Sequence, residues 1–376
     1  MPTSTGSRLS GLRFTDPQRE AAWSRAVVPA GAGPELPSSA RELRVEIAGA
    51  GRSRGLAEWL EETWATSLVV LDRGTVVHEW YADGLDAGTL FLGASMTKSV
   101  LAHLVGRAVG EGDLALTDAV TAHVPELLDS GYAGTSVLDV LTMTTGVDWV
   151  EDHRDPGSLA SRLLGCFAAG ADSRSVLRDV RPGMAPGTRF SYCTADSQVL
   201  DWVRERATGR AYVDDVALLW QDLGCTHDAA VATDGAGVAM AGGGLAATTR
   251  DWGRVALLAV DGAVQSHRLL DPDWVEAAAR PAYPFLAPGR LPSSITTHAG
   301  FGYHWWPMDA DGARLTADGS RGQFACADRR TGAVVVKTSA WPYDDFLVDR
   351  QARDLSYLGL HALLDTIPAR TKESAP

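Results

Sequence analysis

Two stretches near the start of the chain show the alternation of apolar and polar residues that is typical of β-strands. Residues 67–72 and 75–81 are rich in β-branched residues and flank Arg73-Gly74, so the pattern predicts a β-hairpin. The alternation returns in four stretches near the other end, at 301–306, 313–317, 323–327 and 333–339. We therefore predict one antiparallel sheet built from both ends of the chain.

Apolar residues at helical spacing dominate the remainder of the chain. The clearest run follows residue 97 and comprises Val100, Leu101, Leu104, Val105, Ala108 and Val109, which predicts a helix with one apolar face. The same spacing predicts further helices at 56–64, 137–143, 159–169, 173–179, 197–208, 249–260 and 348–364. We expect an α/β (α+β) fold in which helices flank the antiparallel sheet.

The order of these elements divides the chain into lobes. Residues 51–115 and 245–376 are predicted to form the sheet lobe, and residues 116–244 an inserted, mainly helical lobe. Residues 1–50 are rich in Pro, Gly, Ser and Arg. We predict that they form an irregular N-terminal arm, with a short strand at 43–47.

Length and composition exclude several classes of function. The chain has 376 residues, 45% of them hydrophobic, and a net charge of −13 without a basic run, which argues against nucleic-acid partners and anionic membranes. No apolar stretch follows the first eight residues and none approaches the length of a membrane span, so we expect a cytoplasmic protein without a signal peptide. A homodimer stays open as an alternative to a monomer.

Cysteine and histidine usage argues against disulfides and metals. No C-x-x-C, His-x-His or H-E-x-x-H motif occurs, so we expect free thiols, no metal and no cofactor. The four cysteines are scattered along the chain, at Cys166, Cys193, Cys225 and Cys326.

The start of the helix after residue 97 contains the first candidate chemistry. Ser95 and Lys98 are three residues apart and would lie on one helical face. A desolvated lysine can take the proton of a serine hydroxyl and activate it as a nucleophile. The chain has 34 lysines and arginines, of which the lysines are only Lys98, Lys337 and Lys372. Because arginine cannot be deprotonated, a lysine retained here indicates a titratable amine. The alternative is a chance match in which the serine only caps the helix.

Four further motifs follow in the sequence: residues 140–146 (Val-Leu-Thr-Met-Thr-Thr-Gly), Tyr192-Cys193-Thr194 after a Pro/Gly loop, Gly242-Gly243-Gly244-Leu245, and residues 319–323 (Gly-Ser-Arg-Gly-Gln). The three consecutive glycines could cradle a phosphate, but no Gly-Lys-Ser/Thr follows them, so we interpret them as a packing turn. With Ser95 and Lys98, this ordered set resembles the serine β-lactamase and penicillin-binding-protein superfamily. The resemblance spans residues 55–365 and is greatest to the class C-like esterase branch and to the nylon-oligomer (aminohexanoate-dimer) hydrolases.

The resemblance implies a β-lactamase/transpeptidase-like fold with an active site in the cleft between the lobes. Ser95 would be the nucleophile that forms an acyl-enzyme, and Lys98 its base. Tyr192 would share the proton relay, with a pKa lowered by neighbouring cations. Without Ser95, a buried core tyrosine would be the preferred interpretation. The backbone N–H groups of Ser95 and Ser320 would form the oxyanion hole.

The chain also departs from the family pattern. β-Lactamases and penicillin-binding proteins carry Lys/His-Thr/Ser-Gly before the oxyanion residue, whereas this chain has Ala317-Asp318-Gly319. The missing cation binds the β-lactam carboxylate, so its loss argues against β-lactams as the main substrate. We interpret Lys337 as an ordinary strand lysine rather than a substitute. Thr194 stands where the family has Asn.

Candidate substrate contacts surround these motifs. In the nylon-oligomer hydrolases an acidic, aromatic loop similar to residues 149–155 faces the cleft, so one of its carboxylates could hold a substrate amine; the alternative is a solvated loop. Alternation places Tyr303 and Trp305 on one strand face, which either lines the site or belongs to the core. The substrate-binding candidates are Trp149, Glu151, Asp152, Thr194, Tyr303, Trp305 and Gly319.

These features favour a serine hydrolase that acts on small-molecule amides or esters through an acyl-enzyme. An acyltransferase that passes the acyl group to an amine or alcohol shares the first half-reaction, so it remains an alternative. A β-lactamase and a non-catalytic binding module are less favoured, because the Lys-Thr-Gly cation is missing and the Ser/Lys/Tyr set is intact.

Overall fold

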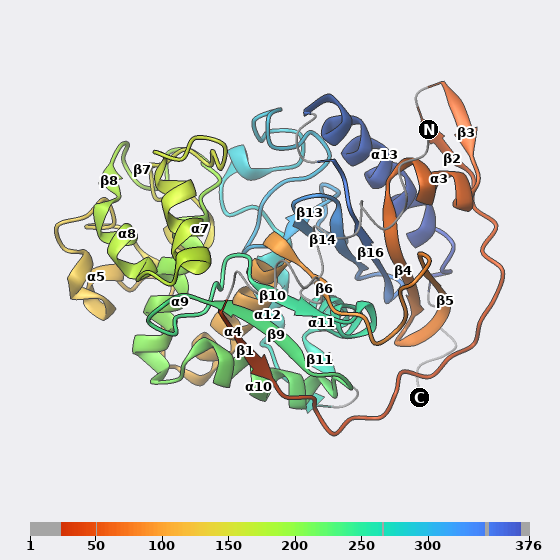
Figure 1. Ribbon diagram of the computed structural model, residues 1–376, viewed down its shortest axis with the longest axis horizontal. Coiled ribbons are helices and arrows are strands. Elements are labelled where there is room, and N and C mark those ends of the chain that lie inside the picture. Colours follow the sequence, from red (N-terminus) through yellow and green to blue (C-terminus); the bar gives the residue numbers. More distant parts are fainter. Residues whose placement is uncertain (1–23, 50, 265–266, 343–345, 370–376) are drawn as a thin grey trace.

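The computed structural model describes residues 24–49, 51–264, 267–342 and 346–369, and a six-stranded antiparallel sheet forms one half of it (Figure 1). The strands lie in the order β13, β14, β15, β16, β4 and β5. Strands from the two ends of the sequence are paired, with Val335 of β16 opposite Val70 of β4. The prediction of one antiparallel sheet built from both ends of the chain is confirmed. The strand bounds are β4 Ala65–Asp72, β5 Thr75–Tyr81, β13 Trp306–Pro307, β14 Arg314–Gly319, β15 Gln323–Asp328 and β16 Ala333–Ser339.

Helices cover both faces of this sheet, and the alternation along each strand divides the apolar residues between two cores. Val69 and Leu71 of β4 belong to the core that includes α4 (Thr97–Glu111) and α11 (Thr249–Asp261). Leu68 and Val70 belong to the core beneath α3 (Leu56–Glu62) and α13 (Phe346–Leu364). Each fully buried side chain of this kind contributes about 1.5–3 kcal/mol. Both faces must therefore be apolar, and α11 packs directly against β4, β15 and β16.

Residues 116–228 are mainly helical and lie on the left of Figure 1. The predicted bounds of α7 (Leu159–Ala169) and α8 (Ser173–Asp179) are confirmed. The central helix α9 (Thr194–Thr208) is buried over most of its length and begins three residues earlier than predicted, so its first turn contains Thr194. The other helices here are α5 Val120–His123, η2 Pro125–Leu127, α6 Val137–Leu141 and α10 Tyr212–Leu223. The division into lobes at residues 115 and 244 stays a prediction.

A second sheet, with the order β1, β9, β10, β6, was not predicted. Its strand β1 (Ser24–Val28) pairs with β9 (Ala229–Thr233). The prediction of an irregular arm over residues 1–50 is therefore wrong for residues 24–28, while residues 1–23 lie outside the described residues. The sheet was missed because its strands are short and rich in alanine, without clear alternation. The remaining strands of this sheet are β6 Phe91–Leu92 and β10 Leu245–Ala247.

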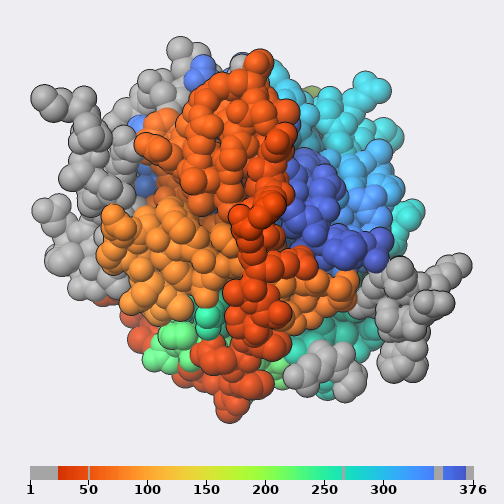
Figure 2. Space-filling view, turned by 90° about the vertical axis from the view of Figure 1, so that its right-hand side faces the viewer, coloured from red at the N-terminus to blue at the C-terminus, as the bar shows by residue number. Residues whose placement is uncertain are grey.

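The segment after β1 runs across the surface and covers the edge of the large sheet, as Figure 2 shows for its red and orange part. The backbone N–H groups of Ser39 and Arg41 donate to the carbonyls of Val76 and Val77 in β5, at 2.9 Å each. Such pairing protects an edge strand from association with other chains. The short strand predicted at 43–47 lies instead at β2 (Ile47–Gly49), paired with β3 (Arg52–Arg54).

The strand predicted at 301–306 is wrong except for its last residue, because only Trp306 and Pro307 form β13. The chain turns here, with the Gly302 N–H donating to the Trp305 carbonyl at 2.8 Å and His304 at a φ of +55°. A side chain at residue 302 would collide with the Ala278 carbonyl, 2.0 Å from its Cβ. The predicted placement of Tyr303 and Trp305 on one face of a strand therefore does not hold. The remaining short elements are β7 Val147–Asp148, β8 Arg181–Pro182, β11 Ala263–Val264, β12 His267–Arg268, α12 Pro272–Ala279 and η3 Pro284–Leu286.

Candidate active site

Ser95 lies at a constrained turn between strand β6 and helix α4. The turn is the single 3₁₀ turn η1 (Ala94–Met96), and it leads directly into α4. The Gly93 N–H donates to the Leu245 carbonyl at 2.9 Å. Only glycine fits at residue 93, because a Cβ there would lie 2.3 Å from the Trp252 ring. Ala94 has a φ of +47°, in the left-handed region that alanine rarely adopts. The half-buried Ser95 is thus held by its surroundings.

We expect Ala94→Gly to raise the free energy of unfolding by about 0.5–1 kcal/mol. Glycine removes the strain of the left-handed conformation in the folded state, and this gain exceeds the free energy lost because glycine makes the unfolded chain more flexible. Urea denaturation of the two proteins measures the difference. The matched control is Ala217→Gly in the middle of α10, at an ordinary helical position, which should lower the same free energy by about 1 kcal/mol. Equal losses in both variants would show that Ala94 is not strained.

The Lys98 amine lies among three oxygen atoms on three different elements. Its Nζ donates to Ser95 Oγ at 3.0 Å, to Thr194 Oγ1 at 3.2 Å and to the Gly242 carbonyl at 2.6 Å. The side chain is only 3% exposed. The predicted contact between Ser95 and Lys98 is confirmed. The Gly242 carbonyl was not predicted as a partner, because its role depends on a backbone direction that no motif encodes.

The turn at residues 242–244 is fixed by α9. Gln198 accepts from the Gly242 N–H at 2.8 Å, and the turn closes through bonds from Gly243 and Gly244 to the Met240 carbonyl. A Cβ on Gly242 would lie 3.0 Å from the Thr194 methyl group. These contacts confirm the interpretation of the three glycines as a packing turn. This turn therefore directs the Gly242 carbonyl toward the Lys98 amine.

Burial lowers the pKa of Lys98 to about 8, and the opposing negative charge of Glu151 keeps it from falling further. A substantial fraction of the amine is therefore neutral near pH 8. A neutral amine can accept a proton, which an ordinary surface lysine cannot do at this pH.

Tyr192 lies beside both groups. The Tyr192 ring stacks on Trp306, with the two ring centroids 5.8 Å apart. Lys98 Nζ lies 5.2 Å from the centroid of the Tyr192 ring. The expectation that cations lower its pKa is wrong: burial and the charge of Glu151 raise the pKa of Tyr192 far above 10, outweighing the opposing effect of the Ser95 hydroxyl. Tyr192 is therefore a neutral phenol, and Lys98 is the group beside Ser95 that can lose a proton near neutral pH.

Glu151 points inward toward the start of α9. Its carboxylate accepts from the Thr194 N–H at 2.9 Å, the Thr194 hydroxyl at 2.5 Å and Trp149 Nε1 at 2.6 Å. His153 Nε2 lies 3.0 Å from the same carboxylate. Burial raises the pKa of Glu151, but these hydrogen bonds and the charge of Lys98 lower it to about 2. With its oxygens occupied by protein donors, Glu151 is not free to hold a substrate amine.

The other candidates in this loop also differ from the expectation. Trp149 is buried and donates to Glu151, so it supports the loop from inside. Asp152 turns away, accepting from the Arg154 backbone N–H at 2.9 Å. The loop is thus neither wholly solvated nor a free acidic surface, because the Glu151 side chain is 18% exposed and turned toward α9, whereas the Asp152 side chain is 35% exposed.

Strand β14 brings Gly319 and Ser320 close to the serine turn. A Cβ on Gly319 would lie 2.2 Å from the Gly93 carbonyl, so only glycine permits this approach. Ser320 is the next residue and is exposed. Asp318 points the other way, accepting from the Tyr357 hydroxyl at 3.0 Å. Ala317, which is buried, stands at the position of the family's cation, and the Asp318 carboxylate beside it faces α13.

Two aromatic candidates lie in the core. Trp305 is 1% exposed and packs on His103 with ring centroids 5.4 Å apart. Tyr303 packs on Trp274 at 5.0 Å. The expectation that they line the substrate site is wrong, because the turn at 301–305 directs both toward α4 and α12. Trp306, which was not a candidate, stacks on Tyr192 instead.

His304 is a structural histidine. Its Nδ1 lies 2.7 Å from the Leu141 carbonyl and therefore carries the proton, so Nε2 accepts from the Ser197 hydroxyl at 2.9 Å. Burial lowers the pKa of His304 to about 3. The ring stays neutral with both nitrogens occupied, and it joins α6 and α9 rather than acting as a base.

Lys337 is more than an ordinary strand lysine. It is completely buried on β16, within 5.9 Å of the ring centroids of Trp59, Phe324 and Trp341. It donates to Ser339 and, at 3.4 Å, to Ser356 of α13. Lys337 therefore faces the core beneath α13 and does not replace the missing substrate cation.

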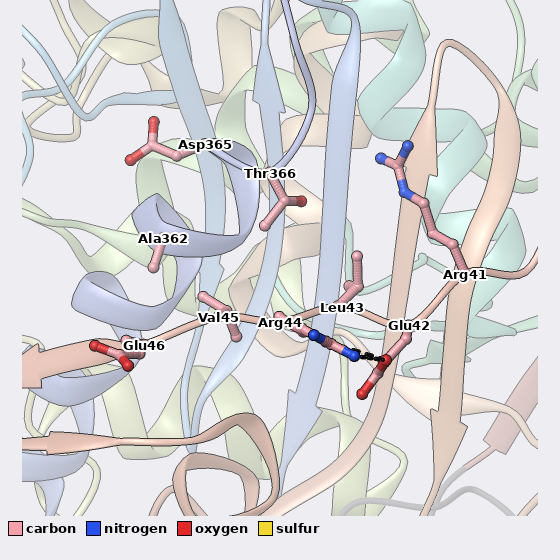
Figure 3. A pocket seen from close by; sticks show the side chains of 9 residues that line it. All are labelled: Arg41, Glu42, Leu43, Arg44, Val45, Glu46, Ala362, Asp365 and Thr366. Atoms are coloured by element: carbon pink, nitrogen blue, oxygen red, sulfur yellow. Dashed lines mark hydrogen bonds and ion pairs between the residues drawn. The ribbon is translucent and has the colours of Figure 1, made fainter.

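A surface groove between residues 41–46 and the end of α13 is a separate feature (Figure 3). Charged residues of both signs line it, including Arg41, Glu46 and Asp365. Within the described ranges, no group of three or more His, Cys, Asp or Glu side chains could hold a metal ion. No helix among these same residues is long and apolar enough to span a membrane.

Comparison with known proteins agrees with this geometry. A family model described as Beta-lactamase matches residues 56–358. The 6-aminohexanoate-dimer hydrolase of Paenarthrobacter ureafaciens is 33% identical over 305 residues, which cover 79% of this chain and 78% of that protein. Esterase EstB of Burkholderia gladioli is 35% identical over 150 residues, or 36% of this chain and 37% of that protein.

A solved Bacillus anthracis structure assigned to the 6-aminohexanoate-dimer hydrolases has the same fold. It superposes with a TM-score of 0.79 at 19% identity and covers 98% of this chain and 100% of its own. The expected β-lactamase/transpeptidase-like fold is thereby confirmed. The family model spans most of the chain and both curated relatives are hydrolases, so the chain belongs to the Beta-lactamase family and is an enzyme of the hydrolase class.

Proposed function

We propose that the chain is a serine hydrolase that cleaves amide or ester bonds of small molecules through an acyl-enzyme on Ser95. The observation that carries this proposal is the contact of Ser95 Oγ with a buried lysine amine whose pKa is lowered to about 8. The amine is close enough to take the serine proton and is partly neutral when it must do so.

In the proposed acylation step, Ser95 Oγ attacks the substrate carbonyl while its proton passes to Lys98. The carbonyl electron pair moves onto oxygen, and the backbone N–H groups of Ser95 and Ser320 stabilise the resulting oxyanion. The close approach of Gly319 to Gly93 supports this pairing. When the intermediate collapses, the C–N or C–O bond of the leaving group breaks. Tyr192 relays a proton from Lys98 to the departing atom.

Deacylation repeats these steps with water as the nucleophile. Water gives its proton to Lys98, its oxygen bonds to the acyl carbon, and Ser95 leaves with a proton returned from Lys98. Free acid and the regenerated enzyme are the products. If an amine or alcohol replaces water at this step, the same acyl-enzyme performs acyl transfer.

Two observations favour small amides or esters over β-lactams. Ala317 stands at the strand position where β-lactamases carry a cation, and the neighbouring Asp318 side chain turns toward Tyr357. The two curated relatives described above are named as a hydrolase of the 6-aminohexanoate dimer and as an esterase. A substrate without a carboxylate needs no cation for binding, so the serine and the oxyanion donors suffice for attack on its acyl carbonyl.

The test is covalent labelling of the full chain with a fluorophosphonate, followed by peptide mass mapping. We expect one adduct on Ser95, its absence in Ser95→Ala, and normal labelling in Ser191→Ala, a half-buried serine next to Tyr192. No adduct and no burst with p-nitrophenyl acetate would favour a non-catalytic binding module. Adding a primary amine during turnover distinguishes hydrolysis, which gives only free acid, from acyl transfer, which gives the amide.

A further inference from the structure

We propose that Glu151 is a positioning residue that acts through Thr194 to direct the lone pair of the neutral Lys98 amine at Ser95. This inference rests on the proposed function, since it concerns how the base is oriented. It replaces the expectation that Glu151 contacts substrate. The direction of the lone pair follows from the number of protons that each partner of Lys98 can donate.

The Thr194 hydroxyl has one proton, and Glu151 takes it. Thr194 Oγ1 lies 2.5 Å from a Glu151 oxygen, and an ionised carboxylate can only accept. The remaining lone pairs of Thr194 Oγ1 face Lys98 at 3.2 Å. Thr194 is therefore an obligate acceptor for Lys98 as long as Glu151 is ionised.

The Gly242 carbonyl is also an obligate acceptor, at 2.6 Å from Lys98. The protonated amine thus has three N–H groups for three acceptors: Gly242, Thr194 and Ser95. When it loses a proton, two N–H groups remain, and two of the partners have no proton to offer. Both N–H groups stay with Gly242 and Thr194, so the lone pair faces Ser95. Ser95 is the one partner that can donate, and its proton is the one that acylation must remove.

Glu151 is itself held by four donors. The Thr194 N–H and Trp149 Nε1 bond to one oxygen, and the Thr194 hydroxyl and His153 Nε2 bond to the other. Because the carboxylate only accepts, His153 Nε2 carries a proton. This arrangement fixes the carboxylate at the start of α9, where the exposed N–H groups of a helix favour negative charge.

Other ionisable groups surround the pair and enter any pH profile. Lys98 faces Tyr192, Cys193 and His304 in addition to Glu151. Glu151 faces His153, Tyr192, Cys193 and Asp196. Of these, Asp196 has a pKa that burial raises to about 7. Its hydrogen bonds go to Tyr132 and Thr145, and it makes none to Lys98, so Asp196→Asn separates its titration from that of Lys98.

The test measures the pH dependence of the p-nitrophenol burst, which reports acylation. In the wild type we expect the rate to rise with pH through an apparent pKa of about 8. Thr194→Val should lower the plateau rate by about 10- to 100-fold because the amine loses its fixed direction. It should also move the acid limb, the part of the profile in which the rate rises as Lys98 loses its proton, to lower pH. The reason is that the ammonium form loses a hydrogen-bond acceptor, which lowers the pKa of Lys98. Thr194→Ser keeps the hydroxyl and should restore both features.

Glu151→Gln tests the carboxylate itself. The amide NH₂ must face two donors, so the plateau rate should fall, and loss of the negative charge should again move the acid limb to lower pH. The matched control is Asp152→Asn in the same loop, which removes a half-buried carboxylate that turns toward Arg154 and should change neither feature.

The results separate three outcomes. A lower plateau with an unmoved acid limb in both Thr194→Val and Glu151→Gln would assign these residues a merely structural role and overturn the inference. So would wild-type behaviour of Thr194→Val. Failure of the wild-type enzyme to label at Ser95 would refute the proposed function instead, and the labelling experiment detects that separately.

Discussion

Lys98→Arg is expected to slow acylation of Ser95 by about 10⁴-fold or more, although the positive charge is kept. The guanidinium cannot lose a proton at any working pH, whereas burial lowers the pKa of the Lys98 amine to about 8. The site therefore loses its proton acceptor and keeps its cation. Rapid mixing with p-nitrophenyl acetate measures the acylation rate directly, and thermal unfolding checks that the variant folds.

Chemical rescue distinguishes a missing base from a damaged pocket. In Lys98→Ala, added methylamine at pH 9 should restore part of the acylation rate, while guanidinium at the same concentration should not. A rate for Lys98→Arg within tenfold of the wild type would refute the role of Lys98 as the base. Rescue by guanidinium would show that only the charge matters.

The strongly patterned parts of the fold could be predicted from the sequence. The hairpin of β4 and β5 and the helices α7 and α8 have clear alternation or helical spacing, and their bounds agree to within two residues. The turn at 301–305 was taken for a strand because aromatic residues favour strands, whereas the left-handed conformation of His304 depends on tertiary packing. Strand β1 could not be predicted because its five residues, Ser24–Val28, show no clear alternation.

The candidate site divides in the same way. The contact of Ser95 with Lys98 follows from helical spacing, and the later motif supplied Tyr192. The direction of the Tyr192 pKa could not be predicted, because burial and Glu151 decide it and both are set by folding. The sequence predicts that Glu151 either contacts the substrate or belongs to a solvated acidic loop, since it does not show which of several adjacent carboxylates turns inward. The charge pattern of the sequence identified the acidic loop at residues 149–155. Only the contacts with Thr194 and Trp149 show that Glu151 is the carboxylate that turns inward.

Tyr192→Phe is expected to slow both acylation and deacylation by about 10²- to 10⁴-fold, the usual range for removing a general acid–base group. The ring and its stacking on Trp306 remain, so the variant removes only the phenol hydroxyl. Pre-steady-state burst kinetics separate the two steps. The matched control is Tyr303→Phe, which removes a hydroxyl from a tyrosine packed on Trp274 and should leave both rates unchanged.

The pH profile of Tyr192→Phe carries a second expectation. Because the pKa of Tyr192 is raised far above 10, we expect the hydroxyl to act as a neutral relay, and Lys98 rather than Tyr192 to set the acid limb. The limb should therefore stay close to pH 8 while the plateau falls. A limb that disappeared in the variant would make the tyrosinate the base, and a plateau within threefold of the wild type would remove Tyr192 from the relay. The first result would reassign the proton acceptor, and the second would leave Lys98 as the sole carrier of the proton between Ser95 and the leaving group.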